Sequence, residues 1–323
     1  MGYRKALGLA AVVGATTLVL SACGGGGSGG DEGLLTVSVT DAPVDGAIRV
    51  VVQFRGIEIK HEDGAPQTIL FDTPMQIDLL EQQDGRAAVL IEDEPLPAGS
   101  FQWLRLIVDA DPNVGGDSYI DFANGQRCEL RIPSGSESGL KLNRGFTLPA
   151  DGSAAVTVDF DLRRSIHAPP GQNVAQDSCT SGQIFMMRPT LRLVDDAQVG
   201  AISGTVDPQI IADECAANEN GAVYIFAVPA GQTAATLDDV DGTNDPLTSA
   251  LVRLNLNSVY SYRAAFIPAG QYTVAYTCDA ATDAPEVDGD EVVFVPAAGK
   301  AANVQNNLVT IVDFTAEDLP TEE

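Results

Sequence analysis

The sequence predicts an all-β protein built from two β-sandwich domains. Apolar and polar residues alternate over residues 35–39, 48–54 and 156–162, which is the pattern of strands with one buried face. Turns rich in Gly, Pro, Asn and Asp separate these short stretches, and helical periodicity is nearly absent. The chain has 323 residues, of which 45% are hydrophobic, so it can form two packed cores.

Residues 1–22 have the pattern of a secretory signal peptide. The only charges before residue 31 are Arg4 and Lys5, and they are followed by an apolar stretch over residues 6–20. This stretch is too short to cross a bilayer comfortably as a helix of the mature protein. We therefore expect the segment to direct export and then to be removed.

Residues 20–23, Leu-Ser-Ala-Cys, resemble the lipobox of bacterial lipoproteins. The resemblance implies cleavage before Cys23 and acylation of that cysteine. More than one acyl chain makes a lasting anchor, since each buried methylene adds ~0.8 kcal/mol of membrane affinity. Gly24 implies no inner-membrane retention signal of the aspartate type, so the outer membrane is the expected location, with the body facing the periplasm or the exterior. A plain secretory signal with an incidental cysteine is the alternative.

After the cysteine, residues 23–33 form a glycine-rich linker that we expect to be disordered. The folded part would stand off the membrane on this tether. The chain is strongly acidic, with a formal net charge of -27. Such a charge disfavours nucleic acid as a partner, because nucleic-acid affinity comes largely from cationic side chains. Solubility alone can explain the acidity, and binding of divalent cations is the other interpretation.

Four cysteines remain once Cys23 is assigned to lipid, and an exported protein favours disulfides between them. Three pairings are open. We favour Cys128 with Cys179 and Cys215 with Cys278, because each pair falls inside one predicted domain. A zinc site is the rival interpretation, but the cysteines lack close spacing and the chain has only two histidines, His61 and His167.

The boundary between the domains is predicted near residues 195–200, where one strand ends and a glycine-bounded strand begins. This gives domains over 34–196 and 199–316, followed by an acidic tail at 317–323. In the first domain the apolar phase slips at residues 55–56, Arg-Gly, which predicts a β-bulge. Further strands are expected at 103–108, 190–194, 223–228, 272–276, 291–295 and 308–314.

The first domain carries a series of sequence blocks in a fixed order. They are Leu-Thr-Val-Ser-Val-Thr-Asp-Ala-Pro-Val-Asp at 35–45, Leu-Pro-Ala-Gly at 96–99, the strand at 103–109, Ile-Pro-Ser-Gly at 132–135, Ser-Gly-Leu-Lys at 138–141, Val-Asp-Phe-Asp-Leu at 158–162 and Arg-Pro-Thr-Leu-Arg at 188–192. Together they resemble domain of unknown function 4382 (DUF4382), found in exported bacterial and archaeal proteins. That family has no established activity, so the resemblance supports export and fold more than function.

The second domain is similar to the transthyretin-like, or carboxypeptidase-regulatory-like, sandwich modules. The residues that carry this likeness are 200–206, 221–224 and 260–274, and Ile-Pro-Ala-Gly-Gln-Tyr-Thr-Val at 267–274 is the nearest match. Both domains are thus expected to be sandwiches of the transthyretin or immunoglobulin type. Related folds include starch-binding modules, which implies polysaccharide as an alternative partner only by analogy.

Two acidic segments could bind metal. Asp239, Asp241 and Asp245 lie on a short loop bent by Gly242 and are the best candidates for calcium ligands, although the loop departs from the EF-hand pattern. A solvated acidic loop is the alternative, and it also explains the dispersed run Asp279, Asp283, Asp288 and Asp290. At residues 41–45 an acidic site competes with a simple turn, in which Asp41 would bond nearby backbone amides.

The usual parts of a catalytic site are missing from the sequence pattern. Ser138 and Lys141 have the spacing of a serine-lysine acylase, but they lie in a glycine-rich turn that enters a strand. An isopeptide bond at Lys141 has no visible partner, and neither histidine has an evident nucleophile beside it. We therefore predict no enzymatic activity. Paired carboxylates leave no local signature, so an envelope glycoside hydrolase or other hydrolase stays as an alternative.

The function predicted from sequence is that of a membrane-anchored cell-envelope lipoprotein with a non-catalytic binding or structural role. Its partners would be the lipid bilayer, through Cys23, and a polysaccharide or another envelope protein. Polysaccharide recognition by the second domain would require a flat stacking platform of exposed aromatic residues. The candidates are Tyr224, Tyr260, Tyr262 and Tyr276, and packing in the core explains the same tyrosines more simply.

Overall fold

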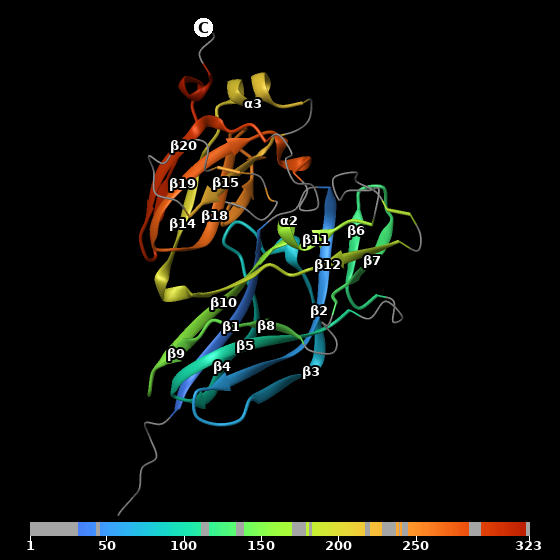
Figure 1. Cartoon of the computed structure of the whole chain (residues 1–323), viewed down its shortest axis with the longest axis vertical. Coiled ribbons are helices and arrows are strands. Elements are labelled where there is room, and N and C mark those ends of the chain that lie inside the picture. Colours follow the sequence, from blue (N-terminus) through green and yellow to red (C-terminus); the bar gives the residue numbers. More distant parts are fainter. Residues whose placement is uncertain are drawn as a thin grey trace, which may run out of the picture.

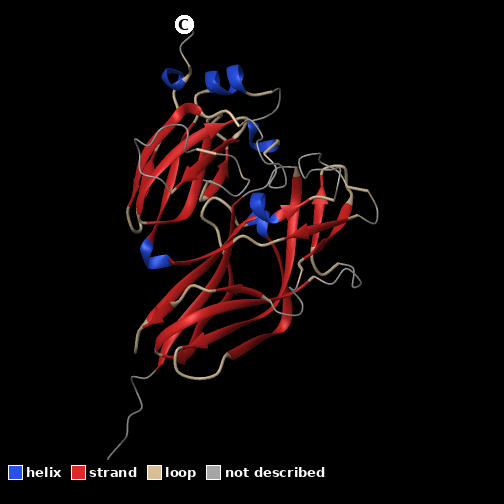
Figure 2. Cartoon of the chain, in the orientation of Figure 1, coloured by secondary structure: helices blue, strands red, loops and turns tan. Residues whose placement is uncertain are grey.

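The computed structural model describes residues 32–42, 46–110, 116–133, 139–169, 179–180, 183–216, 220–227, 237–238, 240, 245–283 and 292–320 (Figure 1). The predicted signal peptide, Cys23 and nearly all of the tether lie outside the described residues. The predicted all-β fold class is confirmed, because strands dominate and the helices are short (Figure 2). Within the described part of the chain, no helix is long and apolar enough to span a membrane.

The first half of the chain folds into two β-sheets. Its strands are β1 (Glu32–Ala42), β2 (Ala47–His61), β3 (Gln67–Asp78), β4 (Ala88–Pro97), β5 (Gly99–Asp109), β6 (Tyr119–Phe122), β7 (Arg127–Arg131), β8 (Leu140–Leu142), β9 (Phe146–Leu148), β10 (Ser153–Asp161), β11 (Ile166–His167), β12 (Ile184–Met187) and β13 (Leu191–Asp195). One sheet has the order β13-β10-β1-β4, and the other has the order β11-β12-β7-β6-β2-β5-β8, with β3 paired to β2 and β9 to β5. The short helices η1 (Leu79–Glu81) and α2 (Leu162–Ser165) follow β3 and β10.

Alternation along the strands places one apolar face of each sheet in a common core. Leu35, Val37 and Val39 of β1 are completely buried. Phe54 of β2, in the larger sheet, meets Phe160 of β10 edge to face, with ring centroids 6.2 Å apart. The two sheets therefore enclose a single hydrophobic core.

The irregularity predicted in the first domain lies in β2. The register of β2 shifts between Phe54 and Gly56 against both of its neighbours, β3 and β5. A Cβ atom at Gly56 would lie 2.3 Å from the backbone oxygen of Ile69, so only glycine lets the two strands approach this closely. The predicted bulge is confirmed.

The second half of the chain forms two four-stranded sheets and a second core. Its strands are β14 (Val199–Thr205), β15 (Ala222–Phe226), β16 (Thr248–Leu251), β17 (Arg253–Leu254), β18 (Tyr260–Pro268), β19 (Gly270–Thr277), β20 (Val295–Val304) and β21 (Val309–Ile311), and its helices are η3 (Asp196–Gln198), α3 (Pro208–Glu214), η5 (Asp279–Ala281) and η6 (Ala316–Asp318). The sheet orders are β17-β18-β14-β21 and β16-β15-β19-β20. Ile202, Val274 and Phe314 are among the buried residues between them.

Both predicted disulfides are confirmed. Cys128 of β7 is bonded to Cys179, and Cys215, at the end of α3, is bonded to Cys278, just after β19. Each bond joins segments within one half of the chain. The two halves are connected by η3, a single short turn, because β13 ends at Asp195 and β14 begins at Val199.

Candidate functional site

Charged and polar groups concentrate where the two halves of the chain meet. Arg163 of α2 is only 3% exposed, although it belongs to the first half. Its guanidinium donates to the backbone oxygen of Ala280 and to Ser249 Oγ, the latter at 3.4 Å, and it lies 5.5 Å from the centre of the Tyr224 ring. Helix α2 therefore inserts a buried cation into the second half.

Two further arginines link the halves. Arg253 of β17 forms an ion pair with Asp84 at 3.0 Å and also donates to the Gln83 side-chain oxygen. Arg164 of α2 forms an ion pair with Asp245, whose side chain is 8% exposed. These contacts come from two separate elements, α2 and β17, so we expect the two halves to move as one body.

Three carboxyl groups are buried beside this junction, on neighbouring parallel strands. Asp41 lies near the end of β1, and Asp159 and Asp161 lie at the end of β10. Because β1 and β10 run parallel with Ala42 opposite Asp161, the carboxyl groups gather at one edge of the sheet. Each has a partner of its own: Gln83 donates to Asp41 at 3.1 Å, Arg192 pairs with Asp159, and the backbone N–H of Arg164 donates to Asp161.

Burial changes the protonation of these groups. It raises the pKa of the Asp41 carboxyl well above its ordinary value, against the lowering effect of the Gln83 hydrogen bond, and nearby Asp159 and Asp161 raise it further. Burial also raises the pKa of Asp161 to about 6, although Arg164 opposes this change. The folded protein therefore holds protons here that the unfolded chain releases.

Asp161→Asn should flatten the dependence of stability on pH. A carboxyl group whose pKa is raised in the folded state stabilises the fold below about pH 4, and this stabilisation is lost as the pH rises through 6. For Asp161 the stabilisation that is lost amounts to about 3 kcal/mol. Asparagine keeps the N-cap of α2 but cannot titrate. Urea unfolding between pH 4 and 7 measures the effect. Asp207→Asn, the corresponding N-cap change at α3, is the control, and an unchanged slope in Asp161→Asn would contradict the assignment.

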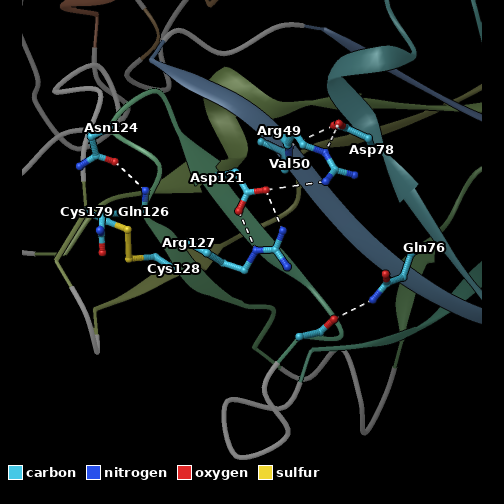
Figure 3. Close-up of polar contacts among 11 residues, drawn as sticks. Arg49, Val50, Gln76, Asp78, Asp121, Asn124, Gln126, Arg127, Cys128 and Cys179 are labelled. Carbon is cyan, nitrogen blue, oxygen red and sulfur yellow. Dashed lines mark hydrogen bonds and ion pairs between the residues drawn. A yellow bond between two sulfur atoms is a disulfide. The ribbon is translucent and has the colours of Figure 1, made fainter.

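A second charged cluster joins β2, β6, the start of β7 and the end of β3 (Figure 3). Arg49 bonds Asp78 at 3.0 Å and lies 3.8 Å from Asp121, which also holds Arg127 at 2.7 Å. The Arg127 guanidinium stacks 3.5 Å from the centre of the buried Tyr119 ring. Cations and carboxylates alternate in equal number here, so the cluster ties strands together and presents no unbalanced charge to a ligand.

The proposed calcium ligands are only partly within the described chain. Asp239 and Asp241 lie outside the described residues, and Asp245 is bound to Arg164. Asp283, from the second acidic run, is buried and accepts bonds from the Tyr224 hydroxyl at 2.5 Å and from the Val240 N–H at 3.0 Å. Among the described residues no group of three metal-binding side chains comes together. Calcium binding at this loop stays a prediction.

The tyrosine platform that the polysaccharide alternative requires is absent among the four candidate tyrosines, and the core-packing explanation is confirmed. Tyr224 and Tyr276 are completely buried, Tyr262 is 3% exposed, and Tyr260 packs partly buried against the second core. The Tyr262 hydroxyl donates to the Val312 backbone oxygen at 2.7 Å. These rings belong to the core, as the simpler explanation holds, because they occupy the inward positions of their strands.

The residues weighed for catalysis have structural contacts. The ring of His61 meets Phe101 edge to face at 5.1 Å, and its Nε2 lies 3.2 Å from the Ala98 oxygen. The Lys141 ammonium lies 4.4 Å from the centre of the Trp103 ring, a cation–π contact. Ser138 lies outside the described residues.

Comparison with known families bears on the first half of the chain. Residues 32–177 match the family model described as Domain of unknown function (DUF4382). The predicted resemblance is thereby confirmed for this segment. The DUF4382 match ends before β12 and β13, yet β13 pairs with β10 and β12 pairs with β7. The two sheets thus extend past the matched residues, up to Asp195.

Comparisons with whole proteins add little to the DUF4382 match. No curated protein matches the chain. Among solved structures, it is similar to the Bacillus anthracis TIE protein (12% identity, 88% of this chain and 34% of that one, TM-score 0.17), a fimbrial protein from Bacteroides ovatus (10%, 88% and 49%, TM-score 0.20) and the major pilin from Streptococcus pyogenes (11%, 88% and 98%, TM-score 0.17). The chain spans less than half of the first two proteins. Scores this low carry no conclusion about function.

Proposed function

We propose that this chain is a lipid-anchored protein of the cell envelope whose two-domain body is a non-catalytic binding or structural module. The observation that carries the proposal is the way in which the five cysteines are used. Two disulfides use four of the five cysteines, and the fifth, Cys23, ends a lipobox-like segment. Disulfides persist in exported proteins, so the bonded pairs and the signal-like residues 1–22 support the same location.

The arrangement of the body supports display from a tether. Strand β1 starts at the end of the molecule that lies away from the second domain, and α3 lies toward the opposite end (Figure 1). A chain anchored at Cys23 would thus hold the second domain farther from the bilayer. The links through Arg163, Arg164 and Arg253 join the domains into one body, which suits a spacer or a binding module.

Cys23→Ser should abolish membrane attachment. Serine cannot accept the lipid, and no helix within the described residues is long and apolar enough to hold the body in a membrane. We expect metabolic labelling with a fatty acid to disappear and the protein to move from the membrane to the soluble fraction. Ser28→Ala, in the tether, is the matched control and should keep both label and fraction. Mass spectrometry of the native protein that found a free thiol at Cys23, or an intact leader, would contradict the proposal.

A further inference from the structure

A cleft of about 310 Å³ opens at the junction of the two domains, beside the linker η3. The loop between β8 and β9 contributes Arg144 from the first domain, η3 contributes Gln198, and the turn between β20 and β21 contributes Asn306 from the second. Val199 and Pro268 add an apolar part to the wall. This volume is at the lower end of those that hold small-molecule ligands.

The walls of the cleft are fixed by close backbone contacts. A Cβ at Gly145 would lie 2.5 Å from the Phe101 oxygen, so glycine lets the Arg144 loop rest on β5. A Cβ at Gly200 would lie 2.3 Å from the Gln305 oxygen, so glycine lets the turn of Asn306 rest on β14. Gln198 of the linker accepts a hydrogen bond from Ala269 N–H at 3.0 Å, and Val199, the first residue of β14, accepts one from Asn307 N–H at 2.7 Å. The backbone that carries these polar side chains is therefore held in place before any ligand arrives.

Arg144 supplies the positive charge in the wall of the cleft. It is exposed, and within the described part of the chain it forms no hydrogen bond or ion pair. A free guanidinium is conspicuous in a protein of net charge -27, where Arg164 and Arg253 at the junction each pair with a carboxylate. Its planar donors match the two oxygens of a carboxylate.

Around this cation, the cleft offers groups suited to hydroxyls. The amide of Asn306 can both donate and accept, and Gln198 already donates to Asp195 at 2.6 Å, which leaves its carbonyl oxygen to accept. We propose that the cleft binds a single carboxylate-bearing sugar, such as a uronate unit of a polysaccharide. This deepens the binding role proposed above and does not depend on the lipid at Cys23.

The surrounding charge limits which ligands fit. Among the described residues that line the cleft, Arg144 is the only cation, and Asp195 belongs to the same lining, so a dense polyanion would be repelled. A second hollow at the junction, lined by Thr40 and Asp41 among others, measures about 20 Å³ and has room for a single water. The cleft at Arg144 is thus the one of the two that can hold a sugar.

The proposal can be tested by titrating the full-length protein, in detergent micelles, with glucuronic acid and observing saturation-transfer NMR. Glucose is the neutral control, acetate the carboxylate control, and the peptide Gly-Glu-Gly tests a protein ligand. We expect glucuronic acid to bind about tenfold more tightly than glucose or acetate, since a hydrogen bond to a charged group adds roughly this much. Arg144→Ala should remove that advantage.

Matched variants distinguish the site from general surface charge. Arg131→Ala, an exposed arginine at the end of β7, should bind glucuronic acid like the wild type. Asn306→Ala should weaken the binding of glucuronic acid and of glucose to the same extent. The proposal is overturned if glucuronic acid does not bind, if Arg144→Ala binds it unchanged, or if the peptide binds more tightly than the sugar. Failure of the lipid anchor would instead show at Cys23 and leave this titration unaffected.

Discussion

Arg163→Ala should lower the free energy of unfolding by about 3 kcal/mol and separate the melting of the two domains. The substitution leaves the Ala280 oxygen buried without its donor and removes the cation over Tyr224. The contact that α2 makes with the second domain would be lost with it. We expect differential scanning calorimetry to show two transitions where the wild type shows one.

Two further variants separate this effect from loss of charge. Arg131→Ala removes an exposed arginine of the first domain and should leave the melting profile unchanged. Arg163→Lys keeps the charge but cannot make the same forked contacts, so it should fall between the wild type and Arg163→Ala. A single transition at the wild-type temperature in Arg163→Ala would show that the domains are held together by other contacts.

Removing either disulfide should destabilise its own domain by about 4 kcal/mol. The bonds close loops with sequence separations of 51 residues for Cys128–Cys179 and 63 residues for Cys215–Cys278, and loops of this size restrict the unfolded chain by roughly that amount. The variants replace both cysteines of a pair with alanine, so that no thiol remains to mispair. Urea unfolding of each double variant measures the loss.

The two double variants serve as controls for each other. The double variant at Cys128 and Cys179 should shift the unfolding of the first domain. The double variant at Cys215 and Cys278 should shift the unfolding of the second domain. Addition of a reductant to the wild type should reproduce the sum of the two losses. A double variant as stable as the wild type would mean that the bond adds nothing to its domain.

Much of the strand content could be predicted because it depends on local patterns. Alternation over residues 48–54 and 156–162 reflects strands with one face in the core, and both segments are strands in the structure except for Leu162, which begins α2. The bulge at Gly56 was visible as a slip in the same pattern. Disulfide pairing followed from the assumption that each bond stays inside one domain, which the structure confirms.

The helices were missed although they carry local signals. Asp207 caps α3 and Pro208 occupies its first turn, an arrangement that favours a helix start, but the helix is only seven residues long. Asp161 caps α2 in the same manner, and α2 is only four residues long. Segments this short show too few turns for helical periodicity to appear.

Contacts between distant segments could not be read from the sequence. Arg163 stands beside Arg164 in a polar stretch and looks like a solvated cation, yet it is buried because the second domain covers it. The polysaccharide alternative requires Tyr224 to be an exposed ring, but β15 is buried on both faces. Phe226 and Phe294 pack against the tyrosine. Likewise, the role proposed for Arg144 depends on a cleft that forms only where the β8–β9 loop, η3 and the β20–β21 turn meet.

The parallel pairing of β1 with β10 has a mechanical consequence. The two strands are in register from Leu34 opposite Ser153 to Ala42 opposite Asp161, and β10 continues into α2, which holds the second domain. A pull on the start of β1 against the second domain therefore slides the strands lengthwise past each other. All ladder hydrogen bonds would share that shear load and fail together, so the fold should resist stretching along this direction far better than peeling from its edges.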